Sequence, residues 1–167
     1  DYKYDTIQFD LQNYWTAQRN LIIGTRLIGV DSSGRDYQIF TIGNRDNLRG
    51  YSNKDDITGR IVALANLETR FYLFRNIDYD LWFMMPDLYF KSLQAVVFTD
   101  NGMTGSSWDD FKTQSKKAGN IHNSVGAGLR LNSFIMQRFP IILRLDYAKR
   151  TDVQSNGVWY FNLGASF

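Results

Sequence analysis

The chain of 167 residues has no cysteine, one histidine and two prolines. The lack of cysteine excludes disulfide scaffolds, zinc–thiolate sites and thiol catalysis. The single histidine excludes a metal site with two histidine ligands, and the sequence predicts no metal site of another kind. The net charge of +2 is too small for the broad basic surface of a nucleic-acid binder, so nucleic acid is not an expected partner.

Long hydrophobic runs are also missing, since no apolar run approaches the ~20 residues that a membrane-spanning helix needs. Aromatic residues, in contrast, are abundant: they make up 16% of the chain, with 12 Phe, 10 Tyr and 4 Trp. This content is high for a soluble domain and is usual where aromatic residues form girdles at a membrane interface. No signal peptide opens the chain, so we expect that it was removed or that the chain is a piece of a longer protein.

Apolar residues recur at every second position in seven segments, which predicts strands rather than helices. The predicted strands cover residues 4–15, 20–31, 59–74, 92–102, 122–132, 140–149 and 157–167. Their alternate positions hold Asn, Gln, Glu, Arg, Gly and Ser, whereas a water-facing strand is rich in Lys and Glu. Long strands of this kind favour an all-β fold, an antiparallel transmembrane β-barrel with a wet or plugged lumen. A soluble antiparallel sandwich or barrel is the alternative.

The connections between the predicted strands fit the loop asymmetry of bacterial outer-membrane barrels, if the last strand ends at the periplasmic side. The two longest loops, 32–58 and 103–121, are then extracellular. The connection 75–91 is periplasmic but long. We interpret it as a segment that lies at the membrane interface, with an eighth short strand as the alternative.

Seven strands do not close a bacterial barrel, which normally has an even number. An open edge in lipid would leave backbone N–H and C=O groups without partners. We therefore expect residues 1–167 to be the C-terminal portion of one larger barrel domain. Self-assembly with copies of the chain and an eight-strand closure through 75–91 are the less favoured alternatives.

One motif stands in the longest loop, and two carboxylates follow it in the next two strands. The motif is Leu48, Arg49, Gly50 and Tyr51, and the carboxylates are Glu68 and Asp100. This succession resembles the C-terminal half of BamA/TamA/FhaC-superfamily barrels, the bacterial surface antigen type. The resemblance covers nearly the whole chain and implies the last seven strands of a sixteen-strand barrel in the outer membrane of a Gram-negative bacterium.

The resemblance implies that loop 32–58 folds back into the lumen, where Arg49 meets Glu68 and Asp100 on the inner wall. We call this set of three residues the latch. Elementary physics favours the same arrangement, because an arginine that is partly removed from water needs partners and its planar fork suits carboxylates. The alternative is that Arg49 is a solvated loop residue.

The resemblance also implies a function in outer-membrane protein assembly or polypeptide translocation. The last strand, 157–167, then lies at the lateral seam, where its edge is open to pairing with a client strand. Its alternating apolar residues are interpreted as a C-terminal insertion signal, made of Trp159, Phe161, Leu163 and Phe167. The implied partners are outer-membrane lipid, unfolded outer-membrane or secreted client proteins and, as further candidates, periplasmic accessory proteins.

Catalysis is not expected from this chain, and neither is a cofactor. His122 and Ser124 are two residues apart on one predicted strand, which does not make an activated pair, and no orienting acid is evident in the sequence. Two other functions share the features of the chain. One is the membrane anchor of a surface-displayed patatin-like lipase, with its catalytic part upstream of Asp1, and the other is a passive outer-membrane pore.

Overall fold

The computed structural model describes residues 2–52, 55–81, 83, 87–117, 120–152 and 156–165. Seven long strands dominate it, and each overlaps one of the seven strands that the sequence predicts. They are β1 (Tyr4–Gln18), β2 (Leu21–Gly34), β5 (Ile61–Phe74), β7 (Leu88–Gly105), β8 (His122–Ile135), β9 (Phe139–Arg150) and β10 (Val158–Ala165). All are joined in one antiparallel sheet in the order β1-β2-β5-β7-β8-β9-β10, so the predicted all-β antiparallel fold is confirmed.

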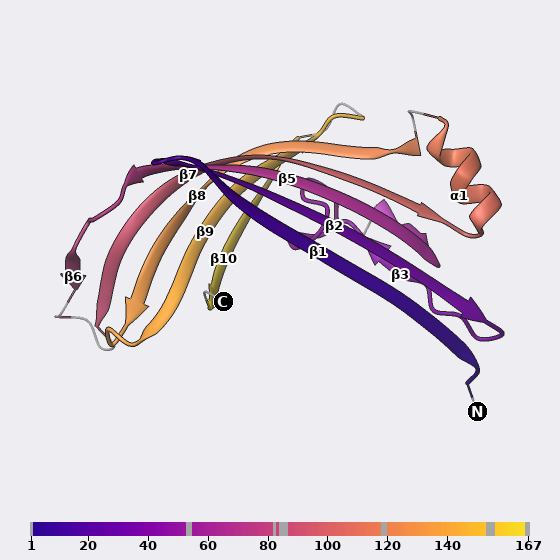
Figure 1. The fold of residues 1–167 in the computed structure, drawn as a ribbon, viewed down its shortest axis with the longest axis horizontal. Helices are drawn as coiled ribbons and strands as arrows, with labels where there is room; N and C mark the ends of the chain where they lie inside the picture. The colour runs from indigo at the N-terminus through magenta and orange to yellow at the C-terminus, as the bar shows by residue number, and fades with distance from the viewer. Residues whose placement is uncertain are drawn as a thin grey trace.

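The sheet is open and strongly arched, as Figure 1 shows. Its two end strands, β1 and β10, pair with β2 and β9 and with no other described strand. The arch corresponds to part of a barrel wall, and a strand on each side would have to continue it. Among the described residues, no helix is long and apolar enough to cross a membrane.

The connection 75–91 contains the short strand that the sequence offered as an alternative for this segment. Three of its residues form the short strand β6 (Tyr79–Leu81), which pairs with Leu88–Phe90 at the start of β7. β7 extends past the end of β5 at this point, and β6 takes the place of β5 beside it, which satisfies backbone groups that would otherwise be unpaired. Because β6 pairs with β7 and with no other described strand, the described strands do not form a closed eight-strand barrel. Trp82 and the segment 84–86 lie outside the described residues.

The loop predicted at 103–121 also contains regular structure. β7 continues to Gly105, and the helix α1 (Trp108–Ser115) follows it. Ser107 caps this helix, since its side chain accepts a hydrogen bond from the N–H of Asp110 at 3.1 Å. The capping pair and the apolar residues Trp108 and Phe111 were readable in the sequence as the start of a helix.

The two faces of the sheet differ as the alternation predicts. Side chains on the convex face are apolar and 40–66% exposed, among them Phe9, Leu27, Leu67, Phe71, Val97, Val125, Leu129, Leu145, Trp159, Phe161 and Leu163. The concave face carries buried polar and charged side chains, which include Gln94, Asp100, Ser124, Arg130 and Asp146. This contrast is the arrangement of a strand wall that separates lipid from a polar lumen.

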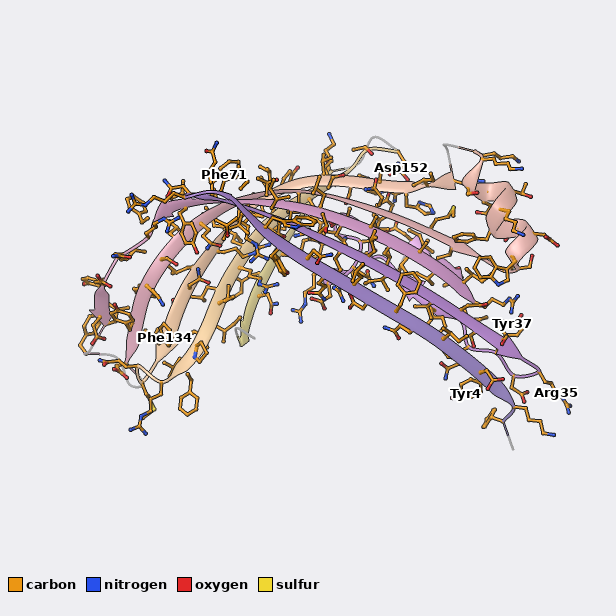
Figure 2. All side chains as sticks on the ribbon, in the orientation of Figure 1. Tyr4, Arg35, Tyr37, Phe71, Phe134 and Asp152 are labelled. Carbon is orange, nitrogen blue, oxygen red and sulfur yellow. The ribbon has the colours of Figure 1, made fainter. Side chains whose placement is uncertain are left out.

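The long loop between β2 and β5 lies against the concave face. It contains a small two-stranded sheet of β3 (Phe40–Ile42) and β4 (Ile57–Gly59), visible beneath the arch in Figure 1. Figure 2 places Tyr37 and Arg35, which precede β3, at the end of the sheet opposite to Phe134. The loop thus enters the arch from one end and covers the inner wall near that end.

Candidate functional site

Two asparagines shape the tip of the long loop. The side-chain oxygen of Asn47 accepts hydrogen bonds from the backbone N–H groups of Gly43, Asn44 and Leu48, at 3.3, 3.2 and 2.7 Å. The side-chain oxygen of Asn44 accepts from Asp46 and Asn47, at 2.9 and 3.1 Å. Asparagine side chains stabilise turns in this way by taking the place of backbone acceptors. The loop therefore holds Arg49 on an ordered backbone.

Apolar packing fixes the loop against the wall. Leu48 and Tyr51 are 0% and 1% exposed. They share one buried cluster with residues of β2, β3, β4 and β5, namely Ile28, Ile42, Ile57, Val62 and Leu64. Burial of a single large apolar side chain stabilises a fold by about 1.5–3 kcal/mol, so these two side chains contribute to the free energy that holds the loop in this position.

Arg49 lies between two apolar anchors and reaches the wall carboxylates. Its Nε and Nη2 atoms donate to the two oxygens of Asp100, at 2.7 and 2.9 Å, in a bidentate contact. The backbone N–H of Arg49 donates to the same carboxylate at 3.2 Å. Its Nη1 donates to Glu68 at 3.2 Å. The structure thus brings together the three residues of the predicted latch.

A third carboxylate joins this set. Asp146 on β9 lies 3.6 Å from Nη1 of Arg49, so the guanidinium faces three acidic groups. The guanidinium also lies over the ring of Phe98, 3.3 Å from its centroid. A cation in this position is attracted by the face of the ring. Arg49 is 8% exposed, and such burial is tolerated because every side of its charge is compensated.

Two further arginines share these carboxylates. Nε of Arg70 donates to Glu68 at 2.6 Å, and Nη2 of Arg130 lies 3.5 Å from Glu68. Arg130 also binds Asp146 through both terminal nitrogens, one of them at 3.0 Å. We call the residues Arg49, Arg70, Arg130, Glu68, Asp100 and Asp146 the Arg49 network. It joins the loop to β5, β7, β8 and β9.

Gly50 and Tyr160 connect the loop to the last strand. Gly50 has a φ of +87°, and a Cβ on it would lie 3.3 Å from the carbonyl carbon of Lys149 and from Cβ of Ser124. A glycine therefore lets the loop backbone lie directly against β8 and β9. Its N–H donates to the hydroxyl of Tyr160 on β10 at 3.0 Å, and this hydroxyl donates to the carbonyl of Tyr51 at 3.1 Å.

Replacing Tyr160 by phenylalanine tests this connection. The variant removes one acceptor and one donor but keeps the ring, and it leaves the N–H of Gly50 without its partner. We expect the free energy of releasing the loop from the wall to fall by about 1–3 kcal/mol, because an unsatisfied buried polar group costs this much. Protease access to the loop in the membrane-embedded protein measures it. An unchanged cleavage rate in Tyr160→Phe would contradict the connection, and Tyr37→Phe, an exposed tyrosine of the same loop, is the control.

Tyr51 anchors the loop at the rim of the wall, near the start of β8. Its hydroxyl donates to the carbonyl of Asn123 at 3.1 Å, and the guanidinium of Arg150 lies 4.4 Å from its ring centroid. Arg150 in turn binds Asp55 at 2.7 Å and Asp152 at 3.1 Å. Burial raises the pKa of the Tyr51 hydroxyl, so it remains a donor at physiological pH. Burial also opposes ionisation of Asp152, but the hydrogen bonds and the positive charge of Arg150 outweigh it and lower the pKa of this carboxyl below its ordinary value.

This shift predicts an acid-sensitive rim. A carboxyl whose pKa is lowered by folding stabilises the folded state fully above its ordinary pKa of 3.8, and this contribution is lost as the pH falls through the lower, folded-state value. We expect protease access to residues 151–152 to rise below pH 4. The variant Asp152→Asn should show a smaller dependence on pH over the same range. Equal pH profiles for the two proteins would refute the assignment to Asp152.

The other residues singled out in the sequence lie apart from the Arg49 network. Trp159, Phe161 and Leu163 lie on the convex face and are 66%, 66% and 57% exposed, and Phe167 lies outside the described residues.

The oxygen of the Ser124 side chain is buried and makes no hydrogen bond with a described residue. Nδ1 of His122 lies 3.6 Å from Asp152, a contact that sequence reasoning missed. No group of three or more His, Asp or Glu among the described residues is arranged to hold a metal ion.

Sequence reasoning also missed Asn47, Arg130, Asp146 and Tyr160. For the last three, alternation already placed the side chains on the inner face of their strands. Alternation does not tell how far along the barrel wall each side chain lies, because this position depends on the register between neighbouring strands. Asn47 was readable only as a turn-forming residue.

Comparison with known proteins identifies the family. The family model described as the Omp85 superfamily domain matches residues 2–167. No curated protein and no solved structure matches the chain. The match spans nearly every residue, and the open antiparallel sheet agrees with part of an outer-membrane barrel. The chain belongs to the Omp85 superfamily.

Proposed function

We propose that this chain is the C-terminal part of a barrel that inserts client β-proteins into the outer membrane or passes an unfolded polypeptide through it. The observation that supports this most strongly is the Omp85 superfamily match over residues 2–167, because the superfamily suggests this class of function. Superfamily proteins reside in the outer membrane of Gram-negative bacteria, and the apolar convex face fits that location.

In this proposal the Arg49 network acts as a latch. It holds the long loop in the lumen, so that the loop supports the inner wall and narrows the pore. No covalent step is needed, and the work is done by pairing of strands and by polar contacts in the lumen. The last strand β10 lies at the open edge of the sheet, where its free backbone groups are available to a client strand.

Reconstitution tests the proposal. The full-length protein that carries this chain is placed in liposomes, and a urea-unfolded outer-membrane barrel is added as the client. Folding of the client is followed by its heat-dependent shift on a gel. We expect faster folding than with empty liposomes or with liposomes that hold an unrelated porin of the same size. Equal rates together with a steady conductance would instead indicate a passive pore.

A further inference from the structure

A polar cavity lies on the concave face beside the Arg49 network. It has a volume of about 240 Å³ and is lined by side chains from the loop and from six strands. Arginines dominate its charged lining, with Arg70, Arg130 and Arg144 on neighbouring parts of the wall. A space of this size holds several water molecules or one small polar group.

The charges at this cavity do not balance. Six arginines line it, and the described carboxylates that contact them number five: the arginines are Arg26, Arg45, Arg49, Arg70, Arg130 and Arg144, and the carboxylates are Asp10, Asp46, Glu68, Asp100 and Asp146. Every one of these arginines except Arg144 contacts at least one of the five carboxylates. Arg144 makes no hydrogen bond or ion pair with any residue that the structure describes. One guanidinium is therefore left without an ion-pair partner among the described residues.

The position of Arg144 makes this imbalance costly. In the sheet its Cα is paired with Arg130 of β8 on one side and with Asn162 of β10 on the other. Like charges directly opposite each other in a sheet repel, and Arg144 is half-buried, so water screens the repulsion only partly. In addition, Nε of Arg130 is buried and has no described acceptor. Two neighbouring arginines thus present unused donors.

We propose that Arg144 binds the carboxylate of an aspartate or glutamate in a polypeptide segment that occupies the lumen. The inference rests on the proposed function, which brings such a segment to the barrel. A carboxylate carries one negative charge, which matches the single unpaired guanidinium, whereas a phosphate monoester carries about −1.5 to −2. The three arginines of the Arg49 network also bind carboxylates, so the proposed ligand belongs to the same chemical class as their partners on the wall.

The location of the cavity favours a peptide over a lipid headgroup. The cavity lies on the polar concave face, and the apolar side chains that suit lipid are on the convex face. Asn162 of β10 also lines it, so an extended segment beside the last strand passes within reach of Arg144. The amide of Asn162 adds a donor for the backbone of such a segment.

Binding of a matched pair of peptides tests the proposal. The full-length protein in nanodiscs is titrated with fluorescent Gly-Ser-Gly-Asp-Gly-Ser-Gly and with the same peptide carrying Asn in place of Asp. We expect a preference of about tenfold for the Asp peptide, from a hydrogen-bonded contact between charged groups. The preference should vanish in Arg144→Gln and survive in part in Arg144→Lys. Arg35→Gln, which removes the same charge at an exposed site outside the cavity lining, should keep this preference.

Thermal unfolding of two variants distinguishes ligand binding by Arg144 from a purely structural role of this residue. If Arg144 is unpaired in the free protein, Arg144→Gln relieves repulsion and its Tm stays equal or rises, whereas Arg130→Gln lowers the Tm. A Tm loss in Arg144→Gln as large as in Arg130→Gln would mean that a carboxylate of the same protein already fills the site, and the proposal would fall. It would also fall if the wild-type protein did not prefer the Asp peptide, or if inorganic phosphate displaced that peptide where acetate did not.

The client-folding assay on the same preparation separates this inference from the proposed function. Accelerated client folding without a preference for the Asp peptide would overturn the role of Arg144 and leave the assembly function intact. A preference for the Asp peptide without accelerated client folding would overturn insertion of client barrels as the function and support the carboxylate site.

Discussion

Replacing Arg49 by alanine is expected to release the long loop from the wall and to abolish most client assembly while the barrel remains inserted. The variant leaves Asp100, Glu68 and Asp146 close together without the guanidinium between them. Removing one partner from a buried ion pair costs about 3–5 kcal/mol, because a charge is left uncompensated. The strand ladder contributes no atom to the Arg49 side-chain contacts, so insertion through the apolar convex face should persist.

Three measurements check this result. Heat-dependent mobility on a gel reports insertion, protease access reports the loop, and the client-folding assay reports function. Arg49→Lys keeps the charge but cannot span two carboxylates with a planar fork, so we expect an intermediate loss. Arg35→Ala is the control, since Arg35 is an exposed arginine at the start of the same loop. Normal client assembly in Arg49→Ala would show that the loop contact is not a functional latch.

Replacing Asp100 by asparagine is expected to have an effect nearly as large. Asp100 is 0% exposed and accepts hydrogen bonds from the backbone N–H, Nε and Nη2 of Arg49 and from the amide of Asn66. An asparagine has one acceptor oxygen, and its own NH₂ group would face these donors. We expect a loss of about 3 kcal/mol in the free energy of unfolding, at the low end for a broken buried pair because Glu68 and Asp146 still face Arg49.

A double-mutant cycle gives the sharper test. The losses in Arg49→Ala and Asp100→Asn should not add in the double variant, because both remove the same contact. Additive losses would mean that the two residues act independently. Asp10→Asn is the matched control. Asp10 binds Arg26 at 2.6 Å, but both side chains are about one-third exposed, and a pair of this kind contributes at most about 1 kcal/mol.

Much of the fold was predictable because a strand has a period of two. Alternation assigned all seven long strands and put Glu68, Asp100 and Asp146 on the inner face without knowledge of the register. It also separated the convex row of Trp159, Phe161 and Leu163 from the concave Tyr160. The strand β6 was harder to predict, since three residues are too few to show a period of two. Its pairing also depends on how far β7 extends beyond the end of β5.

The candidate site was predictable only in part, for a different reason. The pairing of Arg49 with Glu68 and Asp100 followed from the motif and from the chemistry of arginine. The contact with Asp146 and the bridge through Tyr160 depend on the arch of the sheet, which turns β9 and β10 toward the loop tip. Curvature of this kind arises from the twist accumulated over many strands and leaves no local signal in the sequence.

The hydroxyl of Tyr160 has a thermodynamic consequence that goes beyond holding the loop. It ties the edge strand β10 to the backbone of Gly50 and Tyr51, so the order of the edge and the seating of the loop share two hydrogen bonds. Linkage is reciprocal: if a seated loop favours the paired state of β10 by some factor, a paired β10 favours the seated loop by the same factor. A polypeptide that displaces β10 from β9 therefore lowers the equilibrium constant for seating of the loop by that factor. Conversely, a ligand that stabilises the seated loop makes the separation of β10 from β9 less favourable.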